Sequence, residues 1–542
     1  MQITHPVAFP AERGLMRSLV TRLTRTPLPL ILVLQAGVAL VLLHNSAFQD
    51  EALYLFAGRQ IVTAWLGGPP VVEPYTHYFS GYPALYPALA GTLDMAGGVE
   101  AARFFSLLCI MGVTACLFFT TRRLFGEASA LFATLVFAFQ GSVLFIARLA
   151  TYDAACLLFL ALATTVALRV GELPLRAALL WAATLGPLLL LAVGMKYAGL
   201  LFVPSIIALL FIQSVRLRGW PRAIVHLGVA LVSLAGAVAL VLAFVSRDAL
   251  IGLSFTTTNR VAFDRTPALT LAWVVISLGG IGLVLGIAGF FLQGKRLVWL
   301  NLTLVLTALL APAYHIYKGE LISLNKHVAF AIFFIAPLAG VALARLADLR
   351  APGQGSQRWP AAIAICLVIF GLGLQQSQVQ YHVWANSTNM ITAMRTMVRP
   401  NVGHYLAEEY DVARYSLQDI TAPWQWSGVN WFEYTDKAHH YLTGVPAYKA
   451  AIAEGYFDVV ELNYGFNVGL DLAIDGGLKS GSAYTLVAKI PYTNSYGLGY
   501  YWIWAKYATA SQACPSASSC ALAQLTRDAP TALLPRKSSL RG

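Results

Sequence analysis

Long apolar runs recur along the first two thirds of the chain, separated by short polar segments. A helix needs about 20 mostly apolar residues to cross a bilayer. The pattern predicts eleven spans, near 27–43, 102–120, 128–146, 154–168, 178–194, 198–213, 223–245, 268–292, 297–314, 328–344 and 360–376. We therefore expect a mainly α protein, a polytopic helical membrane bundle.

Two stretches depart from this pattern. The segment 44–101 is a long first loop in which EALYLFAGRQIVTAWLGG repeats its apolar residues at helical spacing, which predicts an interfacial helix. After residue 377 the long apolar runs end. There YFDVVELNYG and SAYTLVAKIPY favour strands, and AYKAAIAEGY favours a short helix ended by glycine.

The pattern divides the chain into four parts. They are a basic N-terminus (1–26), a transmembrane domain (27–377), a small α/β domain (378–510) and a flexible Ala, Ser and Pro-rich tail (511–542).

Composition and charge fix the class of protein and its orientation. The chain is 58% hydrophobic and only 11% charged, whereas soluble domains carry about 25% charged residues. The net charge of +12 is spread over short loops, which favours positive-inside topology and excludes a nucleic-acid surface. Four arginines precede the first span and predict a cytoplasmic N-terminus. An odd number of spans then puts 378–542 outside, which fits an integral protein of a bacterial plasma membrane.

The cysteines indicate packing more than chemistry. Four of the six lie in apolar runs, whereas Cys514 and Cys520 flank a short loop and could form a disulfide in an oxidising compartment. The sequence has neither a CxxC motif nor Cys/His metal spacing.

Two acidic positions are candidates for chemistry. Asp50 and Glu51 follow the first span at the expected outer face, where a carboxylate could act as a general base or simply favour a helix start. Asp153 opens the fourth predicted span on the same face. It could instead be a helix cap that pairs with Arg148.

Several cations are expected on the same face. Lys196 stands alone between two apolar runs and suits an anionic headgroup, although a snorkelling lysine is the alternative. Lys318, Lys326 and His327 share one short loop and could clamp a phosphate or form a solvated loop face. His77, in the first loop, is a further outside histidine.

Acids and cations on one membrane face suit transfer from a lipid-phosphate donor. One carboxylate would take the proton of the acceptor, and the cations would stabilise the departing phosphate.

The order of these segments resembles that of the polytopic GT-C glycosyltransferases that use polyprenyl-phosphate sugars. It is most similar to the family 39-like group, which includes protein O-mannosyltransferases, aminoarabinose transferases and lipopolysaccharide galacturonosyltransferases. The matching pieces, up to about residue 210, are FQDEALYLFAGRQI, YPALYPALAGTLDMAGGVEAARFFSLL, RLFGEASALFATLVFAF, ARLATYDAACLLFLALA and GMKYAGLLFVP.

The resemblance implies roles for particular residues. Asp50 would be the catalytic base supported by Glu51, and Asp153 would be the second acidic position, orienting acceptor or sugar. Lys196 and the Lys326–His327 region would hold the donor phosphate. Further substrate contacts are expected from Arg148, Tyr152 and His77.

The resemblance also implies a single displacement that inverts the anomeric centre, and it assigns no cofactor besides the lipid-linked sugar donor. The partners would be a polyprenyl-phosphate sugar, membrane lipids and a glycan, lipid or protein acceptor, with no nucleic acid. A divalent metal on the acidic pair is possible in such enzymes, although no metal ligand set is predicted.

Two other classes remain open from the sequence. A transporter or flippase of lipid-linked glycans would place charges inside its spans and often show repeats. A membrane-anchored cell-envelope binding protein would use the C-terminal domain and leave the long first loop without a role.

Overall fold

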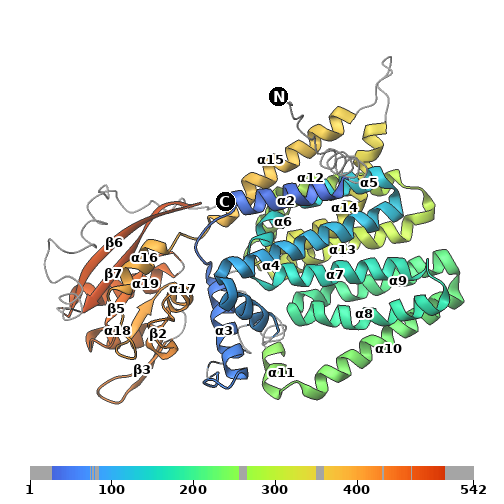
Figure 1. The fold of residues 1–542 in the computed structure, drawn as a ribbon. Helices are drawn as coiled ribbons and strands as arrows, with labels where there is room; N and C mark the ends of the chain where they lie inside the picture. Colours follow the sequence, from blue (N-terminus) through green and yellow to red (C-terminus); the bar gives the residue numbers. More distant parts are fainter. Residues whose placement is uncertain are drawn as a thin grey trace, which may run out of the picture. The chain divides into compact units, whose positions relative to one another are not determined.

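The structure of the chain is a computed structural model that describes residues 27–71, 73, 75, 79, 85–254, 265–348, 359–429, 432–465, 467–481 and 483–506. It comprises two compact units (Figure 1). The helical unit contains Met1–His44 and Ala57–Tyr381, and the α/β unit contains Asn45–Phe56 and His382–Gly542. Cys514, Cys520 and the predicted terminal segments 1–26 and 511–542 lie outside the described residues.

Each predicted apolar window falls on a helix or helix pair of the helical unit. These elements are α2 (Leu28–Leu42), α4 (Leu85–Phe125), α5 (Glu127–Ala138) with α6 (Gly141–Ala147), α7 (Tyr152–Val170), α8 (Leu175–Met195), η2 (Tyr197–Phe202) with α9 (Val203–Arg218), α10 (Trp220–Phe244), α12 (Ala268–Leu292), α13 (Val298–Lys318), α14 (Leu324–Asp348) and α15 (Trp359–Tyr381). The short helices α11 (Arg247–Ser254) and η4 (Lys295–Leu297) lie between them.

The helical membrane bundle is confirmed, with a smaller number of spans. Among the described residues nine helices are long and apolar enough to cross a membrane, and the bent pair α5–α6 could be a tenth. This number is smaller than the predicted eleven. One reason is that α2, with 15 residues, is shorter than a full span.

Two breaks interrupt helices that the hydropathy pattern could not resolve. Helix α4 begins in the predicted first loop and kinks at Gly97 and Gly98, where Gly98 has φ 68°, a conformation that favours glycine. Helices α5 and α6 bend by 66°. The Gln140 side chain causes a new helix start there, because it accepts hydrogen bonds from the backbone N–H groups of Ser142 and Val143.

Helix α14 is the centre of the helical unit. Of its most apolar window, 94% is buried, as expected for a helix that is hydrophobic all round. Helix α12 approaches it closely through Gly289, because a Cβ at that position would overlap the Leu338 carbonyl. Lys326 and His327 lie in the N-terminal turn of this buried helix.

The α/β unit is built on a five-stranded sheet of order β2-β1-β5-β7-β6. The strands are β1 (Tyr405–Ala407), β2 (Trp426–Ser427), β5 (Val459–Leu462), β6 (Tyr484–Asn494) and β7 (Gly497–Lys506), and a separate hairpin pairs β3 (Glu433–Thr435) with β4 (Tyr441–Thr443). Strand β1 is parallel to β2 and β5, whereas β7 is antiparallel to β5 and β6. The helices are α16 (Thr388–Arg395), α17 (Tyr410–Ser416), η5 (Pro423–Gln425), α18 (Gly444–Ala453) and α19 (Val468–Ser480).

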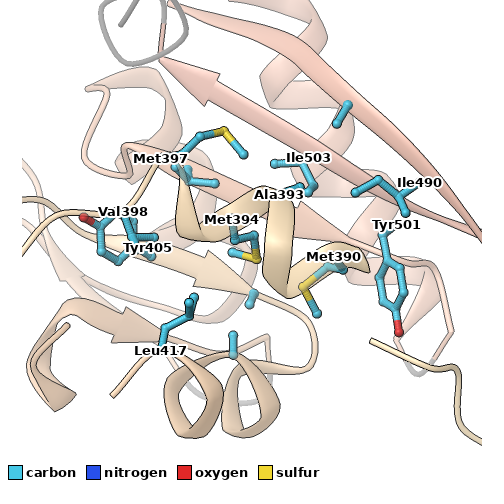
Figure 2. Packing of buried hydrophobic residues seen from close by; sticks show 14 of the residues in the cluster. Met390, Ala393, Met394, Met397, Val398, Tyr405, Leu417, Ile490, Tyr501 and Ile503 are labelled. Atoms are coloured by element: carbon cyan, nitrogen blue, oxygen red, sulfur yellow. The ribbon is translucent and has the colours of Figure 1, made fainter. Parts of the chain in front are cut away.

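Both faces of the sheet are packed, because side chains alternate along each strand. Tyr501 and Ile503 of β7 and Ile490 of β6 join Met390 and Met394 of α16 in one core (Figure 2). A second core contains residues of β5 and β7 together with α18 and α19.

Several predicted helices and strands of this region and the first loop are present. Helix α3 (Gln49–Trp65) forms where a helix is predicted in the first loop, β5 and β6 fall on the two predicted strands, and α18 covers the predicted short helix. Gly455 follows that helix with φ 68°. The boundary between the two units falls inside α3, after Phe56, and at Tyr381 rather than residue 377.

Candidate functional site

A buried ion pair joins Asp153 and Lys196 in the helical unit. The Lys196 Nζ lies 2.6 Å from Asp153 Oδ1, and the Thr151 hydroxyl donates to Asp153 Oδ2 at 3.0 Å. Asp153 lies in the first turn of α7, after the cap residue Thr151, and Lys196 follows the last residue of α8. Lys196 is 3% exposed, so it does not snorkel. Its ammonium also lies 4.9 Å from the centre of the Tyr152 ring.

This pair borders a pocket of about 520 Å³. Its apolar lining comes mainly from η2, the start of α9 and α13, with Leu200, Leu201, Phe202, Pro204 and Ala311. Its polar lining includes Tyr152, Lys196, Tyr314, His315, Lys318, Glu320, Ser323 and His327. The pocket is therefore amphiphilic, with an apolar wall and a cluster of cationic and imidazole side chains.

Two histidines are linked inside this pocket. The His315 Nδ1 lies 2.6 Å from the Glu320 carbonyl oxygen, and the His315 Nε2 lies 2.7 Å from the His327 Nδ1. Because a carbonyl can only accept, the His315 Nδ1 carries a proton, and neutral His315 then accepts from His327. His315 thereby orients the His327 ring, a role that the sequence did not reveal.

The other predicted substrate-contact residues are placed differently. Lys326 is 6% exposed and interacts electrostatically with Asp153. Arg148 is buried and forms an ion pair with Glu100 at 2.5 Å, not with Asp153. Glu100 also binds Arg103, its neighbour at i+3, at 2.8 Å. His77 lies outside the described residues.

Asp50 and Glu51 lie in the first turn of α3, within the part of that helix that belongs to the α/β unit. Glu51 is fully buried, and its Oε2 accepts the backbone N–H of Phe48 at 2.9 Å. This contact is one half of a capping box, so Glu51 stabilises the helix start. Asp50 is half-buried, so this residue is more exposed than Glu51.

Among the residues that the structure describes, no three His, Cys, Asp or Glu side chains converge as ligands for an ion. Glu51 is also engaged as a helix cap.

A second group of carboxyls lies where the parallel strands β1 and β5 end. Glu408 accepts the backbone N–H groups of residues 463–465 at 2.6 to 3.0 Å. Burial raises the pKa of Asp471 to about 8, and the neighbouring Glu408 carboxylate adds to this shift. Burial likewise raises the pKa of Glu409 to about 7 and that of Glu461 well above its usual range. The folded unit therefore holds protons that the unfolded chain releases.

We expect the α/β unit to lose stability as the pH rises. Carboxyls with raised pKa values contribute stability below their unfolded pKa, near 4, and that contribution is lost as the pH passes through about 7 to 8. One pKa unit corresponds to about 1.4 kcal/mol. Thermal unfolding of the full-length protein between pH 5.5 and 9 should show a melting temperature that falls with pH.

The matched variant is Asp471→Asn, whose amide can still donate to Glu408 but cannot ionise. It should flatten the pH dependence, whereas Glu433→Gln, at an exposed carboxyl of β3, should not. A melting temperature that stays constant or rises over this range in the wild type would contradict the assignment.

Comparisons with known proteins give the type of fold. The described part of the chain has the fold of the GT-C membrane glycosyltransferases. It combines a helical unit of apolar spans with a smaller C-terminal unit that contains a sheet. Residues 88–243 match the family described as dolichyl-phosphate-mannose-protein mannosyltransferase. This matched region runs from α4 to α10 and includes Asp153 and Lys196.

Solved structures agree with this fold. ArnT from Cupriavidus metallidurans bound to undecaprenyl phosphate is similar with a TM-score of 0.60 and 14% identity, over 90% of this chain and 99% of that one. The apo state of the same protein is similar with a TM-score of 0.59 and 14% identity, over 89% of this chain and 99% of that one. The apo oligosaccharyltransferase of Archaeoglobus fulgidus is similar with a TM-score of 0.53 and 13% identity, over 87% of this chain and 74% of that one. A search of curated proteins found no match.

Proposed function

We propose that this integral membrane protein is a glycosyltransferase. It would move a sugar from a polyprenyl-phosphate donor to an acceptor hydroxyl on the extracytoplasmic face of a bacterial plasma membrane. The observation that carries the proposal is the amphiphilic pocket bordered by the buried Asp153–Lys196 pair. The solved relative with undecaprenyl phosphate supports the choice of donor class.

The pocket suits the phosphate and the first part of an isoprenoid chain. Ligand pockets of about 300–1,000 Å³ are typical of small-molecule sites, and this one has about 520 Å³. The apolar wall would contact the prenyl chain, while Lys196, Lys318 and His327 would face the phosphate. Asp153 compensates the charge of Lys196 and fixes its position, and Lys326 adds a further positive charge nearby.

The reaction would be a single displacement that inverts the anomeric carbon. The acceptor oxygen bonds to that carbon while its proton passes to the Asp50 carboxylate. The bond from the carbon to the phosphate oxygen breaks, and its electron pair leaves with the polyprenyl phosphate. The cations stabilise the charge that grows on this leaving group. No general acid is needed, because phosphate is already a stable anion.

The remaining predicted residues receive supporting roles. Glu51 holds the start of α3, and Asp153 orients sugar or acceptor through its contact with Lys196. Tyr152 contributes an aromatic face beside the ammonium. Arg148 acts through its ion pair with Glu100 rather than by direct substrate contact. For His77 we retain the sequence-based prediction of substrate contact.

The test is incubation of the purified protein in nanodiscs with a panel of polyprenyl-phosphate sugars and candidate acceptors. We expect one donor to yield free polyprenyl phosphate and a glycosylated product with inverted anomeric configuration by NMR. A flippase would move the lipid across a vesicle bilayer without breaking the glycosyl bond. If the lipid-linked sugars cross the bilayer and every donor stays intact, the protein is a flippase and this proposal is wrong.

A further inference from the structure

The start of the first loop belongs structurally to the C-terminal domain. Residues Asn45–Phe56, which include Asp50 and Glu51, form one compact unit with the chain from His382 onward. More than 300 residues of sequence separate the two segments. This association gives the C-terminal domain a structural connection to the proposed catalytic base.

Trp384 holds the segment at its beginning. Its indole Nε1–H donates to the Ser46 carbonyl at 3.1 Å, and its own carbonyl accepts from the Asn45 Nδ2 at 3.1 Å. The Ser387 backbone N–H donates to the Ser46 hydroxyl at 2.9 Å. The Trp384 ring also packs against Phe48, with 4.9 Å between ring centres.

Arg414 holds the segment at its end. Its guanidinium lies 4.7 Å from the centre of the Phe56 ring, and both side chains are buried, at 4% exposure. Arg414 is fixed in turn by an ion pair with Asp411, one turn earlier on α17, at 2.9 Å. A planar, paired guanidinium on an aromatic face is a specific contact that lysine reproduces poorly.

Asp50 lies between these two contacts. The capping hydrogen bond from Phe48 N–H to Glu51 closes the first turn of α3 around it. The backbone at Asp50 therefore cannot shift freely while Trp384, Arg414 and Glu51 keep their partners. General-base catalysis needs this restraint, because a misplacement of about 1 Å can cost about 100-fold in rate.

We propose that the C-terminal domain positions the catalytic carboxylate, with Trp384 and Arg414 as positioning residues. The inference rests on the proposed function, since it takes Asp50 as the base. It assigns the domain a role in the turnover of the bound complex rather than in donor binding.

The test compares Trp384→Phe and Arg414→Lys in the full-length protein in nanodiscs. Trp384→Phe keeps a ring against Phe48 but removes the donor to Ser46, and Arg414→Lys keeps the charge but removes the planar group. We expect kcat to fall about 10- to 100-fold with little change in the donor KM. Amide hydrogen exchange over residues 49–53 should accelerate.

Matched controls are Trp424→Phe and Arg395→Lys. Trp424 is 56% exposed, and Arg395 is an exposed partner of Asp419 in the same domain. Both variants should retain wild-type kcat and exchange rates. Melting temperatures within a few degrees of wild type would show that the two test variants are folded.

If amide hydrogen exchange over residues 49–53 is unchanged in both test variants, the positioning role is overturned. This measurement does not require that the donor is known. A loss that lies in the donor KM alone also overturns it. The proposed function fails separately, if the wild-type protein cleaves no donor of the panel or if Asp50→Asn keeps full activity.

Discussion

Replacing Asp50 with asparagine should abolish sugar transfer while the protein still folds and binds its donor lipid. Asparagine has almost the same shape but cannot accept the proton of the acceptor. Removal of a general base costs about 10²- to 10⁴-fold in rate. The measurement is kcat for transfer, beside the affinity for polyprenyl phosphate and the melting temperature.

Glu51→Gln is the matched control for this prediction. A glutamine side chain can still accept the backbone N–H of Phe48, so the helix start should persist. We expect a much smaller loss of kcat than for Asp50→Asn. Equal losses in the two variants would show that Asp50 has no special role, and full activity of Asp50→Asn would exclude it as the base.

The second large effect is expected at the buried ion pair. Lys196→Met should leave the Asp153 carboxylate buried without its ammonium partner, which typically costs about 3–5 kcal/mol of stability. The same variant should bind polyprenyl phosphate about 10- to 100-fold more weakly, because a charged hydrogen bond contributes about 1.5–3 kcal/mol. Thermal unfolding and lipid-binding assays measure the two effects separately.

The double variant Asp153→Asn with Lys196→Met separates structure from ligand binding. Removing both charges should restore much of the stability, because no uncompensated carboxylate remains. Phosphate binding should stay weak, because the ammonium is still missing. If the double variant binds polyprenyl phosphate as tightly as wild type, Lys196 does not contact the phosphate.

The membrane fold was predictable because the bilayer imposes a simple rule. Each apolar window had to become a helix, since an unsatisfied backbone group in hydrocarbon costs several kcal/mol. The predicted likeness to GT-C glycosyltransferases is confirmed at the level of the fold. The breaks at Gly98 and Gln140 were not predictable, because they depend on backbone conformation and side-chain capping that leave the hydropathy unchanged.

The sheet was predictable only in part. Strand β6 has 11 residues of mixed β-branched and aromatic character, which is enough to show a strand pattern. Strands β1 and β2 have three and two residues, too few to show any periodicity. Strand β7 was missed as well, although its residues GLGYYWIWAK are rich in aromatic side chains.

The candidate site, too, was predictable only in part from the sequence. Asp153 and Lys196 were both recognised as unusual, since each interrupts apolar sequence. Their pairing was not predicted, and the nearby Arg148 turned out to bind Glu100 instead. Sequence proximity is a poor guide there, because the turn between α6 and α7 directs Arg148 and Asp153 to different partners.

The sequence by itself determined a polytopic membrane protein, the type of its fold and a short set of charged residues worth testing. These follow from hydropathy and residue order, because an apolar run in a bilayer must form a helix whatever the rest of the chain does. Only the tertiary structure decided which charges neutralise each other, that Glu51 caps a helix, and that Trp384 and Arg414 hold the first-loop segment. Such contacts join residues tens to hundreds of positions apart, and their energy exists only once the chain has packed.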